Sequence, residues 1–244
     1  MRQPSTTTTR PVARFTDTRW TLVMTTVQAD PALAQRALLE LCTQYWYPVY
    51  TYLRHSGHPS LLAEEICIAF FEDLLQSPVL VAAAPAQGRF RDFLLAALRR
   101  FLALDWREAE EYGDDCALLA PPDTAELEER HRHEPAGLRP DHAFHRGYAL
   151  DLIASAYRHL RFEAVQAGRE DMFEVLAPYL AVDAETGMLD CFARQLDARP
   201  LVLLLALQRL RQRFRELVEA EIAQTVGRDV EHARERTILL AILQ

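Results

Sequence analysis

Apolar residues recur at helical spacing in the long hydrophobic stretches of this chain, and no strand-like alternation rises above the background. Between 88 and 106 they occupy positions 90, 93, 94, 97, 98 and 101. Steps of three and four residues place them on one face of a helix. A second stripe of this kind consists of Leu203, Leu207, Leu210, Phe214 and Leu217. Glycine, with 8 of 244 residues, is scarce. We therefore predict an all-α fold.

Local signals divide the chain. Asp30-Pro31 is a typical helix start, Gly57 interrupts the pattern, and Ser60 can cap the next helix. A stretch rich in carboxylates and prolines separates two helical blocks, as a linker with one short helix would. We expect a flexible N-terminal arm (1–18), a first helical domain (19–107), an acidic linker (108–141), a second helical domain (142–226) and a C-terminal helical tail (227–244).

The charge balance limits the possible partners. A net charge of −8 argues against a general nucleic-acid coat, but it allows a local basic site. All 27 basic residues are arginine. The four cysteines are far apart, which is typical of reduced thiols. No signal peptide is evident, and the longest apolar runs are much shorter than the roughly 20 residues that span a bilayer. We expect a cytoplasmic protein without a membrane partner.

Catalytic chemistry has little support in the sequence. Adjacent carboxylates at 64–65 and 114–115 have no accompanying nucleophile, and no phosphate-binding loop or hydrolase motif is present. Four histidines lie in or beside the acidic stretch without a further ligand at zinc spacing, and we interpret them as solvated: His131, His133, His142 and His145. The prediction is a non-enzyme with no metal, cofactor or small-molecule substrate.

Arginine and aromatic residues are interleaved between 87 and 107. Guanidinium groups bind phosphates and aromatic rings stack on unpaired bases, so this pattern favours single-stranded nucleic acid. An amphipathic core helix with an arginine-rich outer face is the alternative. The residues concerned are Arg89, Phe90, Arg91, Phe93, Arg99, Arg100, Phe101, Trp106 and Arg107.

Several segments, taken in order, resemble the extracytoplasmic-function sigma factors. They are TRWTLV (18–23), YWYPVYTYLRHSGH (45–58), LAEEICIAFFEDLLQ (62–76), GRFRDFLLAALRRFLALDW (88–106) and LQRLRQRFRELVEAEIAQTV (207–226). The resemblance covers most of residues 18–226. It implies a sigma region 2-like helical bundle and a sigma region 4-like helix-turn-helix domain, joined by the acidic linker.

The resemblance also implies a function. Such proteins bind core RNA polymerase, direct it to promoter DNA and melt the −10 element. By position, Glu64 and Glu65 match the acidic pair that docks on the polymerase, with Phe70 and Phe71 as the apolar core beside it. The −10 and melting set would be Arg89, Phe90, Arg91, Arg99, Arg100, Trp106 and Arg107. A helix-turn-helix at about 189–215, with Asp197 at the turn, would hold the −35 and backbone contacts Arg199, Gln208, Arg209, Arg211 and Arg213.

Three departures from the family pattern support a different interpretation. Cys67-Ile68-Ala69 replaces a polar run, and REAEEYGDD replaces a basic stretch after Trp106. Leucines occupy the positions of the recognition helix that should carry hydrogen-bonding groups for base readout: Leu201, Leu204 and Leu205. Since they lie outside the core stripe, we expect them to form an exposed apolar patch. The alternative function is therefore a degenerate sigma-like protein that has lost −35 recognition and binds a protein through this leucine-rich helix.

The resemblance also implies two candidate regulatory partners. Some members of the resembling family are controlled by a Ser/Thr kinase, and others by an anti-sigma protein, so either is a candidate partner. Thr51, just before the docking segment, is the candidate phosphorylation site, because a phosphate there would add negative charge beside the polymerase-facing surface. An ordinary helix threonine is the alternative.

Overall fold

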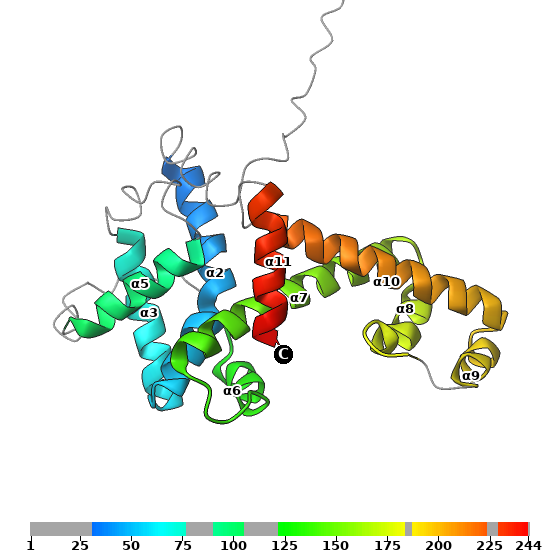
Figure 1. Ribbon diagram of the computed structural model, residues 1–244, viewed down its shortest axis with the longest axis horizontal. Coiled ribbons are helices and arrows are strands. Elements are labelled where there is room, and N and C mark those ends of the chain that lie inside the picture. The colour runs from blue at the N-terminus through cyan, green and yellow to red at the C-terminus, as the bar shows by residue number, and fades with distance from the viewer. Residues whose placement is uncertain (1–30, 77–89, 105–121, 184–186, 224–228, 244) are drawn as a thin grey trace, which may run out of the picture.

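The computed structural model (Figure 1) describes residues 31–76, 90–104, 122–183, 187–223 and 229–243, and within these ranges it contains helices and no strand. The all-α prediction is therefore confirmed for the described residues. The elements are α2 (Pro31–His55), α3 (Ser60–Gln76), α5 (Phe90–Ala103), α6 (Thr124–Arg132), α7 (Pro140–Gln166), α8 (Glu170–Leu176), the 3-10 turn η3 (Ala177–Tyr179), α9 (Met188–Gln195), α10 (Pro200–Ala223) and α11 (Asp229–Leu243).

Helix starts follow the local signals. Helix α2 begins at Pro31, as the sequence predicts, and α3 begins at Ser60, which is its first helical residue and not the residue before it, where a cap would lie. Between them Gly57 has a φ of 93°, a left-handed conformation that glycine adopts without steric cost. The expected N-terminal arm lies outside the described residues, and the expected helical tail contains α11.

Helix α7 belongs to both halves of the molecule. Its 27 residues correspond to a length of about 40 Å. The first half packs on α2 and the second half packs on α8 and α10, as Figure 1 shows for the long green helix that crosses the molecule. The expected boundary between two domains at 142 therefore falls inside the first turn of a helix that both share.

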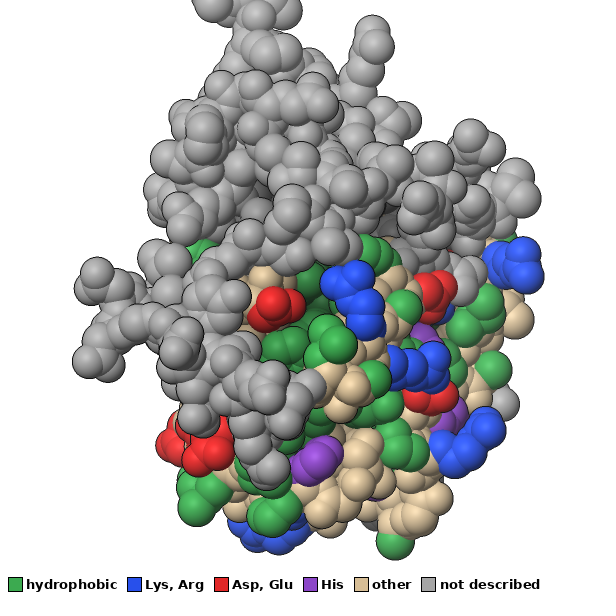
Figure 2. Space-filling model, turned by 90° about the vertical axis from the view of Figure 1, so that its left-hand side faces the viewer, with side chains coloured by type: hydrophobic (Ala, Val, Ile, Leu, Met, Phe, Trp, Pro, Cys, Tyr) green, Lys and Arg blue, Asp and Glu red, His purple; other side chains and the backbone are tan. Residues whose placement is uncertain are grey.

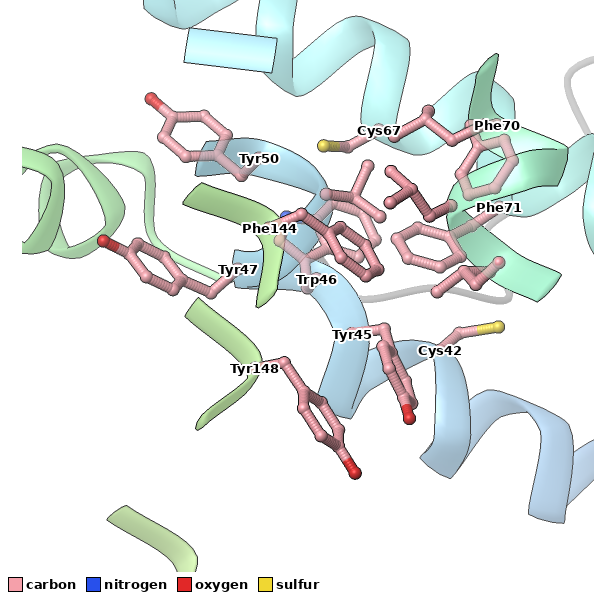
Figure 3. Close-up of a cluster of buried hydrophobic side chains, with 14 of the residues drawn as sticks. Cys42, Tyr45, Trp46, Tyr47, Tyr50, Cys67, Phe70, Phe71, Phe144 and Tyr148 are labelled. Carbon is pink, nitrogen blue, oxygen red and sulfur yellow. The ribbon is translucent and has the colours of Figure 1, made fainter. Parts of the chain in front are cut away.

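The larger core is aromatic (Figure 3). Trp46 of α2 stacks on Phe71 of α3 with 5.2 Å between the ring centroids, and Phe144 of α7 is fully buried in the same cluster. Tyr45 stacks on Tyr148 at 5.2 Å, which joins α2 to α7. Burying such side chains is the main favourable contribution to folding.

A smaller core joins the second half of α7 to α8 and α10. Its buried members are Ala156, Leu160, Ala164, Phe173, Ala177 and Leu217. Polar contacts support it: Arg213 of α10 donates to Glu163 of α7 at 2.6 Å, and Ser155 of α7 donates to buried Glu221 of α10 at 3.2 Å. The second half of α10 is therefore bound to α7.

The described part of the expected acidic linker is packed against the helical core. It contains one short helix, α6, whose Leu127 is buried beside α2 and α3. Glu128 accepts a 2.8 Å hydrogen bond from Arg54 and another from the hydroxyl of Tyr50. A carboxylate of the stretch that the sequence describes as an acidic linker thus pairs with residues of the first helical block.

Helices α2 and α7 approach each other closely at Gly147. A Cβ atom placed there would lie 3.0 Å from Cγ2 of Thr51 and 3.3 Å from the Cα of Pro48. We expect Gly147→Val to destabilise the protein by about 1–3 kcal/mol through overpacking against backbone atoms. Urea denaturation measures the loss. Arg158→Val, at an exposed position of the same helix, is the matched control for the β-branched side chain, and an equal loss there would contradict the steric explanation.

Candidate nucleic-acid interface

The first turn of α5 is covered. Arg91, which the sequence assigned to phosphate binding, is 3% exposed and forms a two-pronged ion pair with Glu235 of α11, itself 1% exposed. One of its two hydrogen bonds measures 3.1 Å, from Nη2 to Oε2. Phe90 is also buried, with its ring edge-on to Tyr45 at 5.1 Å. In this conformation neither side chain can contact nucleic acid.

The last two turns of α5 carry solvent-exposed arginines. Arg99 is half exposed and pairs with Asp141 at the start of α7, and Arg100 is exposed. Figure 2 shows the face on the side of α3 and α5, where the described arginines lie singly among acidic and hydrophobic side chains. Arg89, Trp106 and Arg107 of the predicted −10 set lie outside the described residues.

The predicted docking residues lie on α3. Phe70 and Phe71 are buried, Phe70 against Phe101 of α5 at 5.6 Å, so they form the expected apolar core. Glu65 is exposed, whereas Glu64 accepts a hydrogen bond from Thr124 of α6. Of the acidic pair, Glu65 is thus the more accessible to a partner.

A short helix, a turn and a long helix occupy the region where the sequence predicts a helix-turn-helix. Helix α9 ends at Gln195, Asp197 has a left-handed φ of 47°, and α10 begins at Pro200. The amide of Ala198 donates to the carbonyl of Ala193 at 2.9 Å and closes the turn. Proline at the first helical position suits the start of α10.

The polar residues predicted to contact −35 DNA or backbone fall into two groups. Arg211 donates to the carbonyls of Tyr179 and Val182, and Arg213 pairs with Glu163 and Glu216. These two arginines bind the protein itself. Arg199, Gln208 and Arg209 are exposed and Arg213 is exposed despite its ion pairs, whereas Arg211 is partly buried.

Leucines dominate the exposed face of the first half of α10, as the sequence predicts. Leu203 and Leu207 are buried in the helix stripe, whereas Leu201 is 65% exposed. The leucine face comprises Leu201, Val202, Leu204 and Leu205, all exposed. Beside it lies a groove of about 640 Å³ between α7, α8 and α10, whose lining includes Leu160, Met172, Phe173, Val202, Leu205, Arg169 and Arg209.

Thr51, the candidate phosphorylation site, is completely buried between α2 and α7. A kinase reaches its hydroxyl only after α7 separates from α2. The phosphorylation hypothesis therefore requires an opened form of the protein.

Three histidines lie partly buried around α2, α6 and α7: His55, His131 and His145. For His131 and His145 this differs from the expected solvated state, whereas His133 is exposed as expected. Burial lowers the pKa of His55 and His131, whose rings meet edge-to-face at 5.0 Å, and it lowers the pKa of His145. Positive charge adds to the shift, from Arg54 at His131 and from Arg91 at His145. The folded state thus favours neutral imidazoles at all three positions.

Acidification is expected to destabilise the protein. The unfolded chain takes up protons at a histidine pKa near 6.5, above the lowered pKa of the folded state, so stability falls as the pH drops through about 6.5. Thermal melting between pH 7.5 and 5.5 measures the slope. His131→Phe should flatten it and the mostly exposed His133→Phe should not. Burial raises the pKa of Asp151, which acts in the opposite sense, so the difference between variants isolates the histidine contribution. An equal pH dependence of the melting temperature in both variants would contradict the attribution of the acid sensitivity to His131.

Comparisons with known proteins supply no family. No protein-family model matches the chain, and no curated protein or solved structure matches it either. Across the described ranges, no helix has both the length and the hydrophobicity needed to cross a membrane. The same ranges contain no cluster of three or more histidine, cysteine or acidic side chains placed to bind a metal ion. Function is therefore inferred from residues and geometry.

Glu235 is the main residue near the candidate interface that sequence reasoning missed. Its partner Arg91 is 144 residues away in the chain, and no local pattern connects them. A signal was nevertheless present: Glu235, Leu239 and Leu243 are spaced four residues apart, so they share one face of α11.

Proposed function

We propose that this protein is a transcription initiation factor of the sigma type, which binds core RNA polymerase and melts the −10 element of its promoters. The observation that carries the proposal is the helix, left-handed turn and long helix formed by α9, Asp197 and α10, at the place where the resemblance implies a helix-turn-helix. A bundle of α2, α3 and α5, which shares its core with the first half of α7 and exposes Glu65, supports the proposed polymerase docking.

Reconstitution with core polymerase tests this function. Sequencing of transcripts should reveal discrete start sites that share a −10-like motif. Arg99→Ala with Arg100→Ala should abolish promoter opening while polymerase binding persists, because the change removes cations from the open end of α5. Arg132→Ala with Arg139→Ala, two exposed arginines of another region, is the matched control. Transcription that survives the first pair of changes would contradict the placement of the melting site.

The leucine face favours a second candidate, a sigma-like protein that binds another protein through α10. Exposed Leu201, Leu204 and Leu205 offer no hydrogen bonds to bases, and Arg211 and Arg213 are bound to the protein's own oxygens. The adjoining groove has an apolar floor. Its rim carries Arg169 and Arg209, for which the described residues provide no ion-pair partner. An amphipathic helix with acidic flanks is the ligand that matches this surface.

Two results separate the candidates. Co-purification with polymerase without enrichment of any promoter favours the second candidate. Leu201→Gln with Leu205→Gln should then abolish binding of the protein partner, while stability changes by at most about 0.5 kcal/mol because both side chains are exposed. Under the first candidate, the same variant retains transcription from the same start sites.

A further inference from the structure

Helix α11 covers Arg91, one of the predicted strand-binding residues, in the first turn of α5. Both terminal nitrogens of Arg91 donate to the carboxylate of Glu235, and the guanidinium lies 5.4 Å from the ring centroid of Tyr148. Arg91 and Glu235 are almost completely shielded from solvent. Figure 1 shows α11, the red helix, lying across α7 between the two halves of the molecule.

Three further contacts attach the described side chains of α11 to the rest of the molecule. Leu239 is buried in the larger core, Arg146 donates to the carbonyl of Leu243 at 3.4 Å, and Arg236 pairs with Glu219 of α10 on the surface at 3.1 Å. A groove of about 370 Å³ separates parts of α11 from α7 and α10, and Leu240 beside it is 54% exposed. Packing that leaves such a groove contributes less dispersion energy than a filled interface.

A carboxylate and a phosphate compete for the same guanidinium. Both accept two parallel hydrogen bonds from arginine, so the Glu235 carboxylate occupies the donors that a nucleic-acid phosphate would use. Arg91 can exchange one for the other only when Glu235 moves away, and Glu235 moves with α11.

We propose that α11 is an autoinhibitory clasp, held by the Arg91–Glu235 pair, whose release frees Arg91 in the first turn of α5 to bind single-stranded nucleic acid. This inference rests on the proposed function, because it takes α5 as the strand-binding segment. The free protein is the closed form, and strand binding is coupled to detachment of α11.

The test uses full-length Glu235→Gln, which leaves the Arg91 charge without its carboxylate. Arg236→Gln is the matched control, because it removes the surface ion pair between α11 and Glu219 of α10. We expect Glu235→Gln to accelerate hydrogen exchange of the α11 amides and to raise the affinity for a fluorescent 20-nucleotide thymidine oligonucleotide about tenfold, while the control matches the wild type. The variant Arg91→Met with Glu235→Leu should keep α11 protected and show no gain in affinity.

Wild-type protein provides a second measurement that does not depend on the folding of any variant. A saturating amount of the oligonucleotide should accelerate hydrogen exchange in α11. Unchanged α11 exchange in the wild type, or equal oligonucleotide affinity of Glu235→Gln and the wild type, overturns the clasp and leaves the proposed function standing. Release of α11 without oligonucleotide binding by any variant overturns both.

Discussion

Replacing Trp46 by alanine is expected to lower the free energy of unfolding by about 3–5 kcal/mol, the largest loss for a single core position in this protein. The indole is 1% exposed and stacks on Phe71, so its removal loses burial and leaves a cavity in the larger core. Since the free energy of unfolding of a globular domain is only about 5–15 kcal/mol, such a loss is a large part of the total stability. Urea denaturation followed by circular dichroism measures it.

Two further variants make this prediction specific. Trp46→Phe should cost less, because phenylalanine retains a stacked ring and removes an indole N–H for which the described residues provide no acceptor. Leu61→Ala, at a position 71% exposed, should change stability by at most about 0.5 kcal/mol. A loss at Trp46 no larger than that at Leu61 would show that the aromatic cluster is not the core that holds α2, α3 and α7 together.

Arg91→Met is the second change with a large expected effect. It removes the arginine that pairs with the buried Glu235 carboxylate, and breaking a buried ion pair from one side costs about 3–5 kcal/mol when the structure stays closed. Detachment of α11 limits this cost, because the carboxylate then reaches water. The double change to Arg91→Met and Glu235→Leu should be close to neutral, since an apolar pair replaces a buried ion pair.

A double-mutant cycle measures the coupling between the two residues. We expect the two single variants to lose stability and the double variant to regain most of it, so the coupling energy is several kcal/mol at pH 7. The cycle should be followed by urea denaturation and by hydrogen exchange of α11, because local release and global unfolding differ in these measurements. Strictly additive losses would mean that the ion pair does not hold α11 closed.

Much of the local structure could be predicted from the sequence. Pro31, Ser60 and Pro200 mark helix starts because capping and proline geometry act within a few residues. The stripe from Leu203 to Leu217 identifies the core side of α10, and by exclusion it predicts the exposure of Leu201 and its neighbours. These predictions succeed because a helix fixes which residues share a face.

The tertiary pairing could not be predicted in the same way. The arginine and aromatic pattern of α5 fits both a nucleic-acid surface and a helix packed in the core. Arg91 is buried and pairs with the carboxylate of Glu235, which lies 144 residues away in the chain. Glu128 likewise pairs with Arg54 across 74 residues, so a stretch that composition alone described as linker packs on α2. Composition indicates that charges are present, whereas only the fold decides which ones meet.

Because α7 takes part in both cores, its residue count fixes the angle between them. Each residue of an α-helix advances the side chains by about 100° around the axis. One residue inserted between Gly147 and Ala156 would therefore turn the small core by that angle relative to the aromatic one, while every side chain on either side kept its identity. The number of residues in this segment of α7 thus sets how the smaller core is rotated relative to the larger core about the helix axis, whatever the hydrophobicity of those residues.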